Sequence, residues 1–184
     1  MRILIADEHV SRTQFFDRAI RTIFAGTNNI EIVICTNRTQ AMTAIDAQLS
    51  KFEPFDVAIM DFSATEVDGS SQLNQIDICR LLKNEMPECK LIIHTSSIAK
   101  FFIFDIIQEI HPDGFVIKSD VEIFFESVFF QKIIRDKKKY YSSEIAAVCD
   151  EIMQDGFFIK KENRNIVQFL ALGYKTKQIA AAMH

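Results

Sequence analysis

Five short runs rich in Ile and Val recur along this chain, and each is followed by a longer segment whose apolar residues have helical spacing. The runs cover residues 3–6, 30–35, 57–60, 91–94 and 115–117. The helical segments cover residues 11–25, 38–49, 75–84, 98–110 and 121–135. Strands that are apolar throughout are buried on both faces. The alternation therefore predicts an α/β fold: a five-stranded, parallel, doubly wound sheet of the flavodoxin type, followed by a small all-α C-terminal segment.

Polar side chains follow four of these predicted strands. Asp7 and Glu8 come after the first strand, Asp61 after the third, Thr95 after the fourth and Lys118 after the fifth. In such sheets ligands bind outside the carboxyl ends of the strands, where the strand order reverses. Three carboxylates at one edge repel one another unless a cation lies between them, and an oxygen-only set favours Mg²⁺ or Ca²⁺. A hydroxyl and a lysine nearby suit a phosphoryl group.

Composition excludes several classes of protein. Hydrophobic residues make up 48% of the chain and charged residues 25%, a balance typical of a globular protein and not of a disordered one. No stretch reaches the roughly 18 unbroken apolar residues of a membrane span, so we expect no membrane segment and a cytoplasmic protein. The four cysteines form no CxxC pair, which favours reduced, buried thiols.

The charges are distributed unevenly. Residues 1–134 contain 12 Lys/Arg against 19 Asp/Glu, whereas residues 135–184 contain 9 against 6. A basic C-terminal part indicates an anionic partner, although ordinary surface charge explains the same numbers. Both interpretations stay open at this point.

Four segments carry a family resemblance: residues 3–9 (ILIADEH), 57–61 (VAIMD), 91–95 (LIIHT) and 113–118 (DGFVIK). In this order they resemble four parts of the receiver domain of two-component response regulators. These are the opening strand, the phosphoacceptor strand, the strand with the switch hydroxyl, and the segment with an aromatic switch residue and a lysine. The resemblance covers residues 1–135 and implies the CheY-like fold.

The resemblance also implies roles for the polar residues. Asp61 would accept a phosphoryl group from a sensor histidine kinase. Asp7, Glu8 and Asp61 would bind Mg²⁺ together with the backbone carbonyl of Ser63.

Three further residues would respond to the phosphoryl group. The resemblance implies that Thr95 donates a hydrogen bond to it and that Lys118 pairs with it. Phe115 would turn inward as Thr95 moves, relaying the event to the face formed by the fourth helix, fifth strand and fifth helix.

The predicted helices at 98–110 and 121–135 are apolar around most of their circumference, more than a helix on one face of a sheet needs. One interpretation is a thick core covered in addition by the C-terminal segment. The other is a protein–protein surface, most simply that of a homodimer.

The remaining chain is predicted to be helical. Residues 136–158 are interpreted as a helical linker. Residues 159–184 read as helix, glycine turn at Gly173, helix, and resemble the start of a LuxR-type helix-turn-helix, the output domain of the NarL/FixJ group. By this resemblance the helix that reads the major groove would follow residues 176–183. The chain as given is therefore expected to reach only DNA phosphates, through Lys175 and Lys177.

The sequence thus favours a non-enzymatic, Mg²⁺-dependent response regulator that is phosphorylated on Asp61 and controls transcription. One alternative is a receiver-based interaction module that signals by protein contact without binding DNA. A less favoured alternative is a metal-dependent phosphatase with Asp61 as nucleophile. Such enzymes carry a second acid two residues later, where this chain has Ser63.

Overall fold

A computed structural model describes residues 1–26, 29–62, 75–97, 99–126, 128–136 and 138–183. The strands are β1 (Arg2–Ala6), β2 (Glu31–Cys35), β3 (Val57–Phe62), β4 (Lys90–Thr95), β5 (Gly114–Ile117) and β6 (Tyr140–Tyr141). They form one sheet in the order β2-β1-β3-β4-β5-β6, with every neighbouring pair parallel. The predicted parallel flavodoxin-type sheet is confirmed. The structure adds a sixth strand of two tyrosines, residues of high β propensity, in the segment predicted as a helical linker.

Helices connect and flank the strands. Their bounds are α1 (Val10–Ile23), α2 (Arg38–Lys51), α3 (Gln75–Glu85), α4 (Lys100–Ile110), a 3₁₀ turn η2 (Lys118–Asp120), α5 (Val121–Glu126), α6 (Phe129–Asp136), α7 (Ser143–Gln154), α8 (Lys161–Ala171) and α9 (Thr176–Ala182). The single helix expected over 121–135 is thus two short helices. Their separation lets Phe124, Phe125 and Phe130 all become buried in one aromatic cluster, with ring centroids of Phe125 and Phe130 4.5 Å apart. One straight helix would have turned part of this sequence to solvent.

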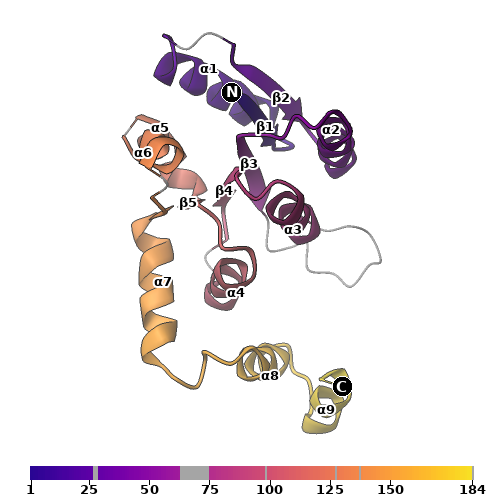
Figure 1. Cartoon of the computed structure of the whole chain (residues 1–184). Helices are drawn as coiled ribbons and strands as arrows, with labels where there is room; N and C mark the ends of the chain where they lie inside the picture. Colours follow the sequence, from indigo (N-terminus) through magenta and orange to yellow (C-terminus); the bar gives the residue numbers. More distant parts are fainter. Residues whose placement is uncertain (27–28, 63–74, 98, 127, 137, 184) are drawn as a thin grey trace.

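Helices cover both faces of the sheet, as Figure 1 shows. One apolar core lies between the sheet and α1, α5 and α6, and includes Phe16 and Phe130. The other lies between the sheet and α2, α3, α4 and α7, and includes Ile45, Ile103 and Ile145. Strands β1, β3, β4 and β5 are buried on both sides, which explains their unbroken apolar sequences, whereas the edge strand β2 is partly exposed.

The C-terminal helices cover the outer side of α4. Helix α7 follows β6 and packs along α4, and α8 lies beyond its end (Figure 1). Arg164 of α8 is only 2% exposed. Its Nε donates to Asp105 Oδ1 of α4 at 3.0 Å, and its Nη1 donates to the carbonyls of Phe158 and Ile159 at 2.6 Å. The guanidinium carbon also lies 4.9 Å from the ring centroid of Phe104.

This arrangement accounts for the excess apolar surface of the fourth helix. Cover from the C-terminal segment, one of the two interpretations, applies to α4. On the other predicted helix some apolar side chains remain at the surface: Ile123 is 65% exposed, Val128 56% and Phe129 37%. A homodimer surface there stays a prediction.

All four cysteines are free thiols, and three are buried. Burial raises the pKa of Cys35 to about 11 and that of Cys89 to about 12, so both remain protonated and unreactive at neutral pH. Within the described residues, no helix combines the length and the apolar character that crossing a bilayer requires.

The Arg164 contact yields a stability prediction. Arg164→Met keeps much of the apolar stem but leaves Asp105 and two carbonyls without their donor. Because breaking a buried ion pair strands its partner, we expect a loss of about 2–3 kcal/mol in the free energy of unfolding, somewhat below a fully buried pair because Asp105 is partly exposed. Urea denaturation measures it. Arg135→Met, at an exposed basic residue ending α6, is the control and should change stability by less than about 0.5 kcal/mol. Equal effects of the two substitutions would contradict the anchoring role.

Candidate functional site

Strand pleating gathers the candidate residues on one face of the sheet. In β1, Ile3 and Ile5 face the α1 core, so Asp7 two residues later continues on that side. In β3, Val57 and Ile59 face the same core, which places Asp61 there as well. The strand order reverses between β1 and β3, and the cleft of a doubly wound fold lies at this point.

The same alternation brings in two more residues. His94 is the register partner of Asp61 across the β3–β4 pair and shares its face. Lys118 lies two residues beyond Val116, which belongs to the α1 core. Thr95 and Phe115 have the opposite parity and belong on the α4 side.

Asp7 is buried and both of its carboxylate oxygens have partners. Oδ1 accepts the backbone N–H of His9 at 2.8 Å and lies 3.1 Å from His9 Nδ1. Oδ2 accepts from Arg12 Nη1 at 2.8 Å. Burial opposes ionisation, but the hydrogen bonds from His9 and Arg12 outweigh it and lower the pKa of Asp7 below its usual value. Asp7 is therefore a carboxylate at neutral pH.

Asp61 forms an ion pair with Lys118, which directly follows β5. Lys118 Nζ lies 2.5 Å from Asp61 Oδ1 and donates to Oδ2 at 2.8 Å. Burial raises the pKa of Asp61, and the negative charge of Asp7 adds to the increase, while the hydrogen bond from Lys118 opposes both. Lys118 thus supplies a positive charge that favours the ionised form of this carboxylate.

His94 lies beneath these two carboxylates and is 1% exposed. Its Nε2 is 3.5 Å from Asp7 Oδ2 and its Nδ1 is 3.9 Å from Asp61 Oδ1. Among the described residues neither ring nitrogen has a hydrogen-bond partner. Burial against Phe16, with ring centroids 5.2 Å apart, lowers the pKa of His94 to about 3, so the ring is neutral.

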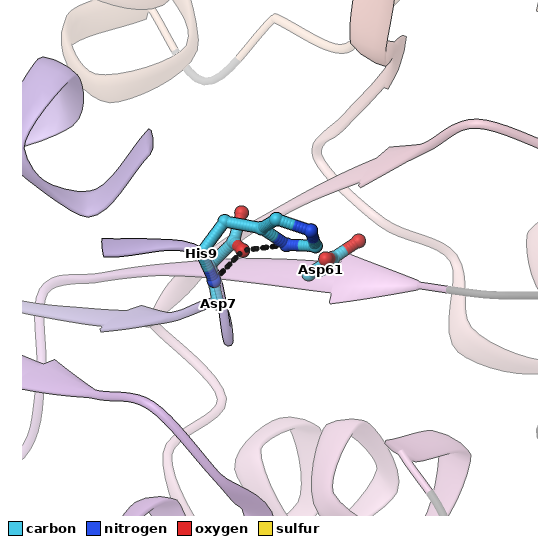
Figure 2. A group of neighbouring side chains, drawn as sticks. All are labelled: Asp7, His9 and Asp61. Atoms are coloured by element: carbon cyan, nitrogen blue, oxygen red, sulfur yellow. Dashed lines mark hydrogen bonds and ion pairs between the residues drawn. The ribbon is translucent and has the colours of Figure 1, made fainter. Parts of the chain in front are cut away.

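Three residues offer atoms that could hold a metal ion. Ligand atoms of Asp7, His9 and Asp61 all lie within 4.8 Å of one another, and Figure 2 shows the side chains facing a common space. Glu8, expected as a ligand, has a side chain that is 77% exposed and lies outside this group, although it lines the pocket. Ser63, whose carbonyl was expected to help, lies outside the described residues. The carboxylate oxygens fit a hard cation, and the imidazole of His9 adds a nitrogen that the sequence analysis did not include.

The predicted switch residues lie on the other side of β4 and β5. Thr95 is fully buried, and its Oγ1 accepts the backbone N–H of Ser97 at 3.0 Å. Phe115 is fully buried in the α4-side core, so its ring already points inward. Their roles in a response to phosphorylation stay predictions.

The pocket above Asp61 extends toward the start of α2. Its volume is about 510 Å³, and residues of the β2–α2 connection form one wall: Thr36, Asn37, Arg38 and Thr39. Asn37 caps α2, its side chain accepting the backbone N–H of Gln40 at 2.9 Å. This wall was not predicted, because the second predicted strand ends in Cys35 with no carboxylate or lysine directly after it.

The C-terminal pair of helices has the predicted helix, turn, helix form. Gly173 follows α8 with φ +82°, a left-handed conformation that glycine adopts without strain. Lys175 directly precedes α9 and Lys177 lies in its first turn, and both are exposed.

Two further residues next to Asp7 and Asp61 were not among the site residues predicted from the sequence. Arg12 lies in the first turn of α1, five residues after Asp7, and points back to the carboxyl end of β1. His94 could have been found from its parity, since it immediately precedes Thr95 and so faces the side opposite to it.

Comparison with known proteins gives likenesses of fold only. No protein-family model matches the sequence, and no curated protein matches it. A structure of two RcsB dimers bound to two parallel DNAs is similar over 100% of this chain and 82% of that chain, with TM-score 0.67 and 17% identity. The RcsB response regulator of Salmonella typhimurium matches over the same shares with TM-score 0.62 and 18% identity.

A structure of a single domain of RcsB is also similar to this chain. The isolated REC domain of RcsB from Salmonella enterica serovar Typhimurium, with the phosphomimetic BeF₃⁻, matches 80% of this chain and 97% of that chain. The TM-score is 0.59 and the identity 18%. The chain therefore has the same fold as the RcsB structures: a flavodoxin-type parallel sheet with helices on both faces, followed by a helical C-terminal segment.

Proposed function

We propose that this protein is a response regulator whose receiver domain is phosphorylated on Asp61 and whose C-terminal helices carry the output. The observation that carries the proposal is the close pairing of Asp61 with Lys118 beside the ionised Asp7, at the point where strand order reverses. A lysine held against an acceptor carboxylate is positioned to meet the negative charge that a phosphoryl group would bring.

The chain acts as an acceptor in this proposal and is not an enzyme. A carboxylate oxygen of Asp61 attacks the phosphorus of a phosphohistidine on a sensor histidine kinase. The new O–P bond forms as the P–N bond breaks, and the imidazole leaves. Lys118 then moves its ion pair from the carboxylate to the phosphoryl oxygens. The Thr95 hydroxyl accepts from Ser97 N–H and retains its own proton, but it would have to turn from the α4 side toward Asp61 to donate that proton to a phosphoryl oxygen.

Mg²⁺ is the cation proposed for the pocket, held by Asp7 and Asp61, with His9 and Glu8 at its margin. When bound, it would neutralise phosphoryl oxygens during transfer. The chain's own residues supply the rest: Asp61 as nucleophile, Lys118 as fixed charge, and Arg12 beside Asp7.

DNA is the proposed target of the output. Four of the similar RcsB structures are complexes with DNA or a promoter, and one of them contains RcsB dimers. In this chain Lys175 and Lys177 are exposed at the start of α9, where they could touch backbone phosphates. A homodimer would use the exposed apolar residues Ile123, Val128 and Phe129 of the α5–α6 region. We propose a cytoplasmic transcription regulator.

A protein-interaction module without DNA binding is the second candidate. The observation favouring it is the apolar surface around the turn between α8 and α9, where Leu170 is 55% exposed, Leu172 73% and Tyr174 42%. Such residues suit contact with a protein surface better than contact with phosphates.

The first prediction concerns the acceptor. Wild-type protein incubated with Mg²⁺ and acetyl phosphate should gain the mass of one phosphoryl group, because Asp61 is the proposed nucleophile of the pocket. Asp61→Asn should show no gain while keeping its circular dichroism spectrum. Intact-mass spectrometry measures both. Asp56→Asn, an exposed carboxylate just before β3, is the control and should be phosphorylated like wild type. Phosphate incorporation that persists in Asp61→Asn would place the acceptor elsewhere.

The second prediction concerns Lys118. Lys118→Ala should still take up phosphate. The structural change that follows phosphorylation should be lost, because no lysine is left to pair with the phosphoryl group. Hydrogen exchange of β5 and α7, compared with and without BeF₃⁻, provides the measurement. A wild-type change in protection on the Lys118→Ala background would contradict the role given to this lysine.

The third prediction separates the two outputs. Phosphorylated full-length gene product should bind promoter DNA in fluorescence anisotropy. Replacing Lys175 and Lys177 by Gln should reduce the slope of log K against log salt by about 2, one per lost phosphate contact. Lys138→Gln with Lys139→Gln, two exposed lysines before β6, is the control. Full-length protein that ignores promoter DNA after phosphorylation would favour the interaction module.

A further inference from the structure

Arg12 reaches from α1 toward the buried carboxylate of Asp7 and the partly buried carboxylate of Asp61. Its Nη1 donates to Asp7 Oδ2 at 2.8 Å and lies 3.5 Å from Asp61 Oδ2. The Arg12 side chain is only one quarter exposed, so its guanidinium is largely shielded from water where it meets the two carboxylates. Figure 2 shows Asp7 and Asp61 close to each other, with His9 beside them.

The charges of the pocket are balanced by its own side chains. Asp7 and Asp61 are matched by the cations of Arg12 and Lys118, each within ion-pair distance of a carboxylate oxygen. Glu8, which would add a third negative charge, is 77% exposed and solvated. A divalent cation is favoured where carboxylates repel one another without compensation. In this pocket much of that repulsion is already removed.

A metal ion would also compete for the same oxygen atoms. Oxygen ligands bind Mg²⁺ at about 2.1 Å. Asp7 Oδ2 is the atom to which Arg12 donates, and Asp7 Oδ1 already accepts the His9 backbone N–H. An ion bridging Asp7 and Asp61 would displace the Arg12 guanidinium from the gap between them.

We propose that Arg12 is an internal counter-ion that competes with the divalent cation for Asp7 and Asp61, so that metal enters the pocket only as Arg12 leaves it. The inference rests on the proposed function, since it concerns the cation of the receiver site. Arg12 is a positioning residue: it holds the two carboxylates together when no metal is bound, and it sets how much metal is needed before phosphate can be accepted.

The test uses Mn²⁺ as the metal probe, with free Mn²⁺ counted by electron paramagnetic resonance. Arg12→Gln removes the charge and retains an amide donor, so this variant should bind Mn²⁺ about tenfold more tightly than wild type, the effect of removing one charge at this range. Arg18→Gln makes the same charge change on the exposed side of the same helix and should bind like wild type. Competition with Mg²⁺ should follow the same order.

A second measurement needs no substitution. In wild-type protein, Mg²⁺ titration should shift the side-chain Nε–H resonance of Arg12 in ¹⁵N NMR spectra and leave that of Arg18 in place. An unmoved Arg12 resonance at saturating Mg²⁺ would overturn the inference even if Arg12→Gln does not fold.

The outcomes distinguish this inference from the proposed function. Equal or weaker Mn²⁺ binding by Arg12→Gln, with Asp61 still phosphorylated in wild type, overturns the role of Arg12 alone. If neither protein binds Mn²⁺, the inference fails. If wild-type Asp61 also takes up no phosphate from acetyl phosphate, the proposed function fails with it.

Discussion

The alternation of side chains along four parallel strands is the constraint on which the rest of this structure depends. Because β1, β3, β4 and β5 are buried on both faces, their apolar residues fix which way each side chain points. A slip of one residue in β3 would turn Asp61 toward α4 and bring Met60 to its place. The packing of two cores therefore determines the geometry of the pocket, and the polar residues at the strand ends follow from it.

Burial then sets the chemistry of those polar residues. Two carboxylates removed from water beside one another are costly unless cations accompany them. Lys118 and Arg12 provide these cations from opposite sides, one from the end of β5 and one from the first turn of α1. The neutral ring of His94 is buried next to both carboxylates, with Nε2 3.5 Å from Asp7 Oδ2 and Nδ1 3.9 Å from Asp61 Oδ1. The arrangement of these side chains therefore depends on charge compensation as well as on packing.

The strand pattern and its polar ends were sufficient to predict the sheet, the convergence of Asp7, Asp61 and Lys118, and the helical C-terminal segment. These features depend on local periodicity and on parallel strand topology, both of which are visible in a sequence. The outward orientation of Glu8, the inward reach of Arg12 and the two-residue strand β6 were not predictable in this way. Each depends on a rotamer or a tertiary contact that neighbouring residues along the chain do not determine. Cover of α4 by the C-terminal helices was one of two open alternatives, because apolar composition cannot distinguish an internal partner from an external one.

The short strand β6 has a consequence for how the two parts of the molecule are joined. Tyr140 and Tyr141 pair with Gly114 and Phe115, and the Ser142 hydroxyl accepts the backbone N–H of Ile117 one residue before Lys118. Helix α7 begins at the next residue, Ser143. The connection is therefore part of the sheet and is not a flexible linker. A displacement of the β5 backbone would be transmitted through β6 and would change the orientation of α7.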